Sequence, residues 1–351
     1  MLRQGTFVSY KDSMIKEIKV SVVISVYNIE KYVSQCLESV LNQSYKNIEV
    51  IIINDGSTDN SRNVCSSFAY DKRVKIINQN NQGLVSSRQN GLKEASGDYL
   101  LFIDGDDWLD IQAIQRMVDP ILKNSKIDMT ICNFSFDYPT KVKRNPWHLA
   151  SGIYDRKMIK NQIIKELIYP RVIPSSICCK LIKKELAEEI LKVDKRISIG
   201  EDTAATTFLV IKSNNIYILD STPLYHYRQN DESMTKVYKK DYWRKTVILY
   251  KNIVNNIFDS ECRLILQPQL DMMLITFSFS VIDNEFIYRC NNTKDIKKIL
   301  YNMINDETLI SAIDRIDYRF YGKNKIYFFL IKFKMINVLF LFAKLIRIVR
   351  K

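Results

Sequence analysis

Short apolar runs alternate with amphipathic stretches over residues 20–103. The apolar runs have strand length, and we expect strands at residues 20–26, 49–53, 74–77 and 99–103. In the stretches between them apolar residues recur at helical spacing, and we expect helices at residues 29–43, 61–70 and 84–95. Regular alternation of strand and helix is typical of a parallel sheet. The pattern therefore predicts an α/β fold.

Polar residues follow the expected strands at the point where each strand ends. Asn28 follows the first strand, Asp55 and Gly56 follow the second, and a polar loop at 78–83 follows the third. With right-handed crossovers these loops open on one rim of the sheet. That rim is where ligands bind in open α/β sheets, so the pattern predicts a binding cleft there.

The fourth strand, residues 99–103, is apolar throughout and ends in three carboxylates within four residues, Asp104, Asp106 and Asp107. Carboxylates packed this closely repel one another, and hard oxygen ligands suit Mg²⁺ or Mn²⁺. A simpler interpretation is a turn in which Gly105 takes a positive φ and the aspartates cap the next helix. The cluster alone leaves both interpretations open.

Composition narrows the classes of protein and of site. A hydrophobic fraction of 46% over 351 residues is that of a folded chain with a real core. Seven cysteines without a C-x-x-C spacing argue against a disulfide framework and a zinc cluster, so we expect reduced, mostly buried thiols. Two histidines exclude a His-rich metal site. The first 18 residues carry no secretion signal, and neither G-x-G-x-x-G nor the P-loop motif occurs.

The net charge of +13 is mostly a property of one end of the chain. Residues 318–351 hold nine lysines and arginines and no acid. Apolar runs at 326–331 and 335–343 are interrupted by lysines and are too short to span a bilayer. This composition predicts a helix on an anionic membrane surface; a packed C-terminal helix and, less favoured, a spanning helix are the alternatives. Basicity confined to one end argues against nucleic-acid binding.

Seven segments of the first third together resemble the nucleotide-binding half of family 2 glycosyltransferases, the large inverting group with a GT-A fold. They occur in order within residues 19–112: SVVISVYN (21–28), CLESVLNQ (36–43), NDGSTD (54–59), NNQG (80–83), RQNG (88–91), GDY (97–99) and FIDGDD (102–107). The resemblance implies a GT-A nucleotide-sugar domain with a helical C-terminal extension. It also implies inverting transfer from a nucleotide donor, with UDP-sugar expected, to a hydroxyl of a saccharide acceptor.

By the resemblance, Asp104 and Asp106 hold Mn²⁺ or Mg²⁺. It also assigns residues to the nucleotide sugar: Tyr27, Asn28, Asp55, Gly56, Arg88 and Asp104. Asp55 is expected to receive the base or ribose, Tyr27 to flank the base, and Arg88 to contact the diphosphate or hold Asp104. From the pattern alone, Asn28 also suits a cap for the helix that follows it.

Glu201 and Asp202 precede an apolar helix at residues 204–211, and spacing alone favours a helix cap supported by the helix dipole. Family 2 enzymes have a Glu-Asp pair at this point. The resemblance therefore implies that Asp202 is the general base toward the acceptor hydroxyl and that Glu201 is its neighbour with a possible acceptor contact.

Residues 225–228 and 233–235 resemble the capsule and cell-wall branch of the family. His226 is expected as a third metal ligand or as a structural histidine, and Arg228 as a cation facing the diphosphate, since its fork suits phosphate oxygens. Lys180 lies where relatives carry a Lys-Leu pair, and both a solvated lysine and an acceptor contact fit it. Acceptors in this branch are surface glycans, often lipid-linked, at the inner face of the membrane.

Beyond residue 112 we expect a loop at 138–145, a helix at 156–168 and two strands, 216–219 and 224–227, on either side of Pro223. We therefore expect four regions: an N-terminal extension (1–18), a GT-A domain (19–240) with nucleotide (19–112) and acceptor (113–240) halves, a helical region (241–317) and a basic amphipathic segment (318–351). The alternative function is a non-catalytic nucleotide-sugar-binding scaffold subunit of a glycan assembly complex. The intact set Asp104, Asp106, Glu201 and Asp202 argues against that alternative.

Overall fold

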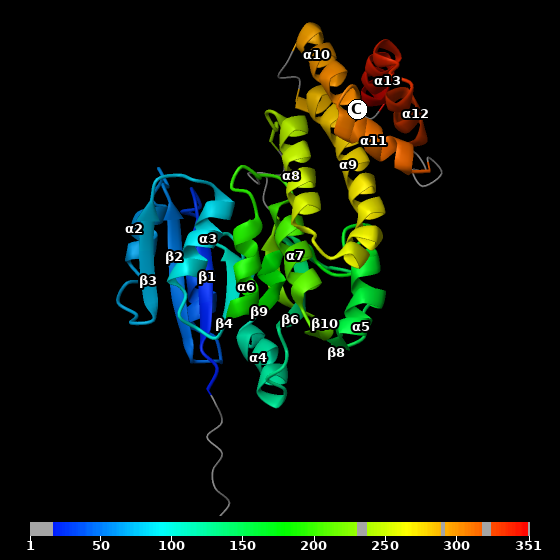
Figure 1. Cartoon of the computed structure of the whole chain (residues 1–351). Helices are drawn as coiled ribbons and strands as arrows, with labels where there is room; N and C mark the ends of the chain where they lie inside the picture. Colours follow the sequence, from blue (N-terminus) through cyan, green and yellow to red (C-terminus); the bar gives the residue numbers. More distant parts are fainter. Residues whose placement is uncertain (1–16, 230–236, 289–291, 318–323, 350–351) are drawn as a thin grey trace, which may run out of the picture.

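The structure, a computed structural model, describes residues 17–229, 237–288, 292–317 and 324–349 (Figure 1). A sheet-containing part forms the lower half of the view, and a group of helices from the last third of the chain lies above it. Parts of the predicted N-terminal extension and C-terminal segment, and residues 233–235, lie outside the described residues.

The first four strands confirm the predicted parallel sheet. Each lies close to its expected bounds: β1 (Val20–Val26), β2 (Ile48–Asp55), β3 (Val74–Gln79) and β4 (Tyr99–Asp104). The apolar residues of β1, β2 and β4 are buried, and those of the edge strand β3 are partly buried. They are parallel neighbours in the order β3-β2-β1-β4. The connecting helices are α1 (Val33–Leu41), α2 (Ser61–Ser66) and α3 (Leu84–Glu94). The first two are shorter than expected.

The sheet continues past β4 as a mixed sheet. Its remaining members are β9 (Lys180–Lys183), β6 (Met129–Tyr138), β10 (Asn215–Arg228) and β5 (Trp108–Leu109), in that order, with β7 (Lys141–Arg144) paired to β6 and β8 (Gly152–Asp155) paired to β10. Antiparallel β9 joins β4 to β6. This arrangement confirms the expected α/β class.

Several expected boundaries in this half were wrong. The polar stretch 138–145, expected as a loop, includes strand β7, which pairs with β6. Two strands expected on either side of Pro223 are one strand, β10, whose register shifts at that proline. The expected helix 156–168 is broken into α5 (Arg156–Met158), a π-helical turn and a 3₁₀ turn.

Three more helices complete this half. α4 (Ala113–Lys123), which contains Pro120, packs on β6; α6 is Lys184–Ala187 and α7 is Glu201–Lys212. All six cysteines in the described part of the chain are buried and free, while Cys290 lies outside it. The expectation of buried thiols is confirmed for those six.

The helical end contains α8 (Tyr242–Asn256), α9 (Ser260–Tyr288), α10 (Thr293–Ile304), α11 (Glu307–Arg315), α12 (Lys325–Lys332) and α13 (Ile336–Val349). Within the described residues α9 alone is long and apolar enough to cross a membrane, and it is mostly buried inside the protein. Buried Asp271 of α9 accepts hydrogen bonds from Tyr250 of α8 and Arg315 of α11. This network fixes α9 as the core helix of the group.

Candidate functional site

The carboxyl ends of β1, β2 and β4 meet at one edge of the sheet, as the sequence predicts. In the register, Ser25 lies beside Asp104, and Val26 lies beside Asn54. The loops that follow these strands therefore start side by side. The predicted cleft residues Tyr27, Asp55 and Asp104 belong to this edge.

The loop after β4 turns under the end of β1. Gly105 does not have a positive φ, so the predicted reason for this glycine was wrong. A Cβ at Gly105 would lie 2.9 Å from the Ser25 carbonyl oxygen and 2.6 Å from Ile29 Cδ1. The aspartates also do not cap a helix, because α4 begins only at Ala113. Close packing against β1 thus explains the glycine and leaves the carboxylates at the edge.

Asp107 anchors this loop to β10. Its carboxylate accepts hydrogen bonds from the Tyr225 hydroxyl at 2.5 Å and from the Arg228 backbone N–H at 2.8 Å, and it is almost fully buried. Burial, together with the charges of Asp106 and Asp104, raises its pKa. The sequence grouped Asp107 with its neighbours and gave no sign of this separate positioning role.

Asp104 and Asp106 are the two carboxylates of the loop left to face a ligand. Burial and the neighbouring charge of Asp104 raise the pKa of Asp106 to about 6. Among the described residues no group of three or more His, Cys, Asp or Glu side chains is arranged to hold a metal. Two carboxylates still fit Mg²⁺ or Mn²⁺, because these ions commonly take one or two carboxylates with substrate phosphates and waters.

His226 is bound on its Nδ1 side by β6. Nδ1 lies 3.1 Å from Asp137 Oδ2 and 3.2 Å from Ser135 Oγ, and the ring stacks on Trp108 with centroids 5.0 Å apart. These contacts agree with the structural interpretation of this histidine. The three predicted ligands Asp104, Asp106 and His226 do not form one metal-binding cluster. The metal role of His226 stays a prediction.

Arg88 joins the two ends of the predicted site. Its Nη2 donates to Asp104 Oδ1 and its Nη1 to Asp202 Oδ1, each at 2.8 Å, and the guanidinium is buried. Arg88 lies in α3, so one side chain links the end of β4 to the start of α7. The predicted contact with Asp104 is confirmed. The contact with Asp202, 114 residues away in sequence, had no signal in the sequence.

Glu201 and Asp202 begin α7, directly after Gly200, whose φ is +76°. The N-cap is Gly200 and no side chain caps the helix, so the capping part of the simple interpretation was wrong. Both acids do lie in the first turn, where the helix dipole favours them. Burial and the charge of Asp202 raise the pKa of Glu201 to about 7. A carboxyl that titrates near pH 7 is suited to proton transfer. Glu201 therefore has a pKa suited to proton transfer, and Arg88 connects its neighbour Asp202 to Asp104. The catalytic roles of the pair stay predictions.

Asp55 holds the loop between β3 and α3. It accepts hydrogen bonds from Gln79 Nε2 at 2.7 Å and from the backbone N–H groups of Gln82 and Gly83 at 2.8 Å. A carboxylate has about four acceptor positions, so these three bonds leave about one unused. A Cβ on Gly56 (φ +72°) would lie 2.7 Å from the Asn81 nitrogen, so this loop tolerates only glycine there. The nucleotide role of Asp55 stays a prediction.

Asn28 does not cap α1, so that expectation was wrong. It has φ +51°, and its Oδ1 accepts hydrogen bonds from the Thr58 backbone N–H at 2.8 Å and from the Thr58 hydroxyl. The N-cap of α1 is Tyr32, without a side-chain cap. Asn28 thus ties the β1 loop to the β2 loop. Tyr27, next to it, is 43% exposed at the same edge.

Arg228 lies beside the aspartate loop. Its guanidinium is held over the rings of Tyr32 and Trp108, 4.8 and 4.5 Å from their centroids, and its Nε donates to the Asp106 carbonyl oxygen at 2.6 Å. Nη2 donates to Gln35. These contacts fix a cation next to Asp106. The role of Arg228 toward the diphosphate stays a prediction.

Lys180 is neither solvated nor placed for an acceptor, so both expectations for it were wrong. It is fully buried, and its Nζ donates to the carbonyl oxygens of Pro174 and Ser176 at 2.7 and 2.6 Å. Burial lowers its pKa. The side chain ties down the loop that precedes β9.

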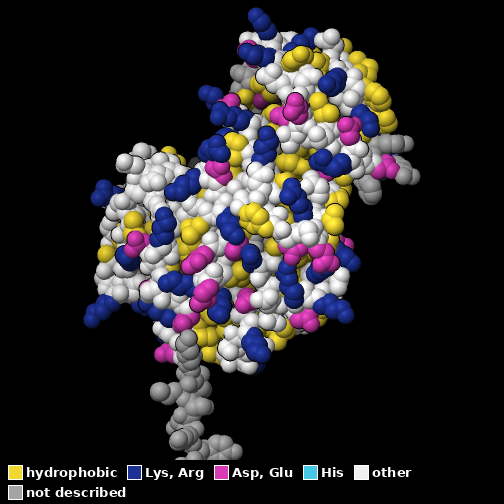
Figure 2. All heavy atoms as spheres, in the orientation of Figure 1, with side chains coloured by type: hydrophobic (Ala, Val, Ile, Leu, Met, Phe, Trp, Pro, Cys, Tyr) yellow, Lys and Arg dark blue, Asp and Glu magenta, His cyan; other side chains and the backbone are white. Residues whose placement is uncertain are grey.

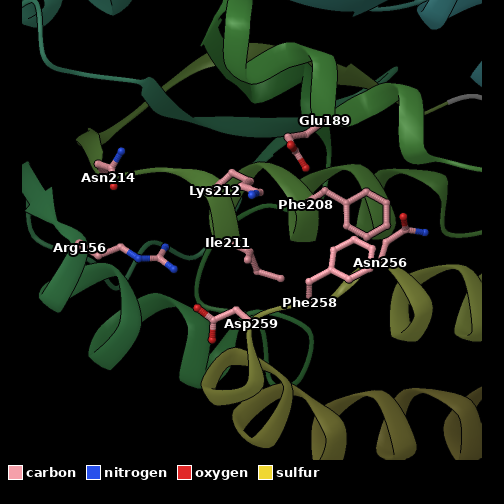
Figure 3. Close-up of a pocket in the computed structure, with 9 residues that line it drawn as sticks. All are labelled: Arg156, Glu189, Phe208, Ile211, Lys212, Asn214, Asn256, Phe258 and Asp259. Carbon is pink, nitrogen blue, oxygen red and sulfur yellow. The ribbon is translucent and has the colours of Figure 1, made fainter.

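A separate cavity of about 230 Å³ lies near the other end of α7 (Figure 3). Phe208, Ile211 and Lys212 of α7 contribute to its wall, together with Arg156 and Phe258. None of the predicted site residues lines it. The predicted site therefore rests on the edge residues and not on this cavity.

Comparison with known proteins identifies the family. A model of "Glycosyl transferase family 2" matches residues 21–191. The putative glycosyltransferase EpsH of Bacillus subtilis is 30% identical over 279 residues, which cover 76% of this chain and 77% of EpsH. The chain belongs to glycosyl transferase family 2. This confirms the resemblance carried by the seven segments.

Two further similarities refine the picture. Glycosyltransferase GlyA of Streptococcus pneumoniae is 30% identical over 67% of this chain, but the match spans only 34% of GlyA. Among solved structures, S. aureus TarS 1-349 in complex with UDP-GlcNAc has a TM-score of 0.65 at 18% identity, covering 93% of this chain and 90% of TarS. At that identity the likeness concerns the fold, and it confirms the GT-A sheet followed by a helical region.

Proposed function

We propose that this protein transfers a sugar from a UDP-sugar donor to a hydroxyl of a saccharide acceptor in surface polysaccharide synthesis, with inversion at the anomeric carbon. The observation that carries the proposal is the Arg88 bridge between Asp104 and Asp202. It joins Asp104, expected on the donor side, to Asp202, expected on the acceptor side. The solved structures of TarS with UDP and UDP-GlcNAc support the choice of donor.

On the donor side, Asp104 and Asp106 would hold Mn²⁺ or Mg²⁺. The ion, when bound, supplies Lewis-acid stabilisation of the departing diphosphate. The raised pKa of Asp106 supports this role, because burial and the charge of Asp104 make its ionised form costly and a bound cation would offset that cost. Arg228, fixed between two aromatic rings, adds a cation for the same oxygens.

On the acceptor side, Asp202 accepts the proton of the attacking hydroxyl. The salt bridge from Arg88 orients the Asp202 carboxylate and leaves its second oxygen without a bond to that guanidinium. The acceptor hydroxyl then attacks the anomeric carbon in a single displacement, UDP departs, and no sugar-enzyme intermediate forms. A measured retention of anomeric configuration would contradict it.

The acceptor we expect is a growing surface glycan, free or lipid-linked, at the inner face of the cell membrane. Support comes from the resemblance of residues 225–228 to the capsule and cell-wall branch. The alternative, a non-catalytic nucleotide-sugar-binding subunit, predicts donor binding without turnover.

A donor screen tests the proposal. Purified protein with Mn²⁺ or Mg²⁺ is incubated with a panel of nucleotide sugars, and thermal shift and release of free nucleotide are recorded. We expect one UDP-sugar to stabilise the protein and to be slowly hydrolysed, and Asp202→Asn to keep the stabilisation but lose the hydrolysis. Binding without any turnover in the wild type would favour the scaffold alternative. Absence of binding to any nucleotide sugar would overturn the site itself.

A further inference from the structure

The hairpin of α12 and α13 packs one apolar face on the helical group. Phe328, Ile331 and Leu339 are buried, and Phe340 is buried against Phe286 of α9 with ring centroids 5.3 Å apart. This face explains how the C-terminal helices are held. The packed-helix alternative from the sequence therefore accounts for about half of their apolar residues.

The other apolar residues of the hairpin face outward. We call the following set the outer apolar face: Phe333 (63% exposed), Met335 (44%), Val338 (44%), Leu341 (58%) and Leu345 (60%). The last three follow helical spacing and lie on one side of α13. Figure 2 shows hydrophobic side chains gathered along the margin of the molecule where α12 and α13 lie in Figure 1. Grouped exposure of this kind marks an interaction surface.

Basic residues surround the outer apolar face. Lys332, Lys334 and Lys344 are exposed beside it, and the sequence from 318 to 351 contains no Asp or Glu. A second copy of the chain would bring like charges together at this face, whereas an anionic lipid surface complements them.

We propose that the α12–α13 hairpin docks the protein on an anionic bilayer. The outer apolar face enters the boundary between headgroups and acyl chains, and the three lysines lie at the level of the lipid phosphates. Because α9 is a buried core helix, the attachment is peripheral and needs no spanning segment. The proposal goes beyond glycosyl transfer and stands without it.

Sedimentation with lipid vesicles tests the docking. The full chain is mixed with vesicles of phosphatidylcholine, or of equal parts phosphatidylcholine and phosphatidylglycerol, and the bound fraction is measured. We expect binding to the anionic vesicles only, weakened by added salt. Equal binding to both vesicle types, or binding to neither, would overturn the proposal.

Charge variants sharpen the test. Replacing Lys332, Lys334 and Lys344 together by Gln should lower the partition coefficient roughly 100-fold. The matched control replaces three exposed lysines elsewhere: Lys72, Lys123 and Lys126. This control should reduce binding far less. An equal loss in both triple variants would mean that net charge and not this face drives binding.

Apolar variants separate the face from charge alone. Leu341→Ser with Leu345→Ser should weaken binding roughly tenfold or more, because both side chains enter the bilayer. Leu122→Ser with Leu264→Ser, exposed leucines of α4 and α9, is the matched control. Sedimentation velocity without lipid tests the other occupant, a second copy of the chain. We expect no dimer that depends on Leu341 and Leu345. A dimer that these two changes abolish, in a protein that does not bind vesicles, would assign the face to a second copy. UDP-sugar hydrolysis in solution should stay unchanged in all four variants.

Discussion

The two edges of one sheet use carboxylates in opposite ways. At the amino edge, Glu49 of β2 accepts hydrogen bonds from Lys19 Nζ, Ser21 Oγ, Ser96 and the Gly97 N–H. Burial opposes the ionised form there, but the bonds from Lys19, Ser21 and Ser96 outweigh it and lower the pKa of Glu49 to about 2. The protein itself satisfies this carboxylate.

At the carboxyl edge the pKa values shift in the opposite direction. Burial and the charge of Asp104 raise the pKa of Asp106 to about 6, and burial and Asp202 raise that of Glu201 to about 7. The protein gathers negative charge here without supplying enough donors for it. The comparison teaches that Glu49 stabilises the fold. The carboxyls of Asp106 and Glu201 destabilise it when ionised, and such groups are suited to bind cations and transfer protons.

The largest effect should come from removing the proposed base. Asp202→Asn keeps the size of the side chain and a hydrogen-bond acceptor for Arg88 but cannot take up a proton. We expect turnover to fall on the order of 10² to 10⁴-fold with little change in donor affinity. Steady-state kinetics and donor titration of the same sample check this. Glu201→Gln is the comparison variant: a larger loss there than in Asp202→Asn would move the base to Glu201.

The amino edge should show a stability effect. Glu49→Gln removes a carboxylate whose folded pKa, about 2, lies below its usual 4.5. The carboxylate therefore adds its full share to the free energy of unfolding above pH 4.5, and that share is lost as pH falls toward 2. We expect a loss of about 2 kcal/mol at neutral pH, measured by urea unfolding. The difference from wild type should disappear near pH 2. A difference that persists unchanged at that pH would contradict the assignment.

The carboxyl edge should show a smaller effect of opposite sign. The folded pKa of Asp106, about 6, lies above its usual 3.8. Ionisation of Asp106 therefore lowers the free energy of unfolding of the ligand-free protein, fully above pH 6 and not at all below pH 3.8. Asp106→Asn should therefore stabilise the ligand-free protein by about 1 kcal/mol at pH 7.5, a Tm increase of about 2 °C. Asp295→Asn, an exposed aspartate in the first turn of α10, should not raise the Tm, because the helix dipole favours an acid there. A lower Tm for Asp106→Asn would contradict this contrast.

Sequence predicted the parts of this site that depend on local pattern. Strand β1 was predicted from Val20 to Val26, its observed bounds, because a buried parallel strand is continuously apolar. The edge position of Asp55 and Asp104 followed from strand order. Contacts between distant segments left no local signal: the Arg88 to Asp202 bridge depends on how α3 meets α7.

Single side chains misled where tertiary contacts override local preference. Asn28 has the character of a helix cap, but the neighbouring loop offers Thr58 as a partner. Lys180 was expected in solvent or in contact with the acceptor, yet its ammonium donates to two carbonyl oxygens in the interior. The role of Gly105 could not be predicted from local sequence, because it depends on the end of β1 packing directly against this glycine.

Calorimetric titration of UDP tests the central contrast most directly. Wild-type protein and Asp106→Asn are each titrated with UDP in the presence and absence of Mn²⁺. We expect Mn²⁺ to tighten UDP binding to the wild type by roughly tenfold or more and to have no effect on the variant, since Asp104 and Asp106 together would hold the ion. Equal UDP affinity with and without Mn²⁺ in the wild type, or an unchanged metal effect in Asp106→Asn, would contradict the account.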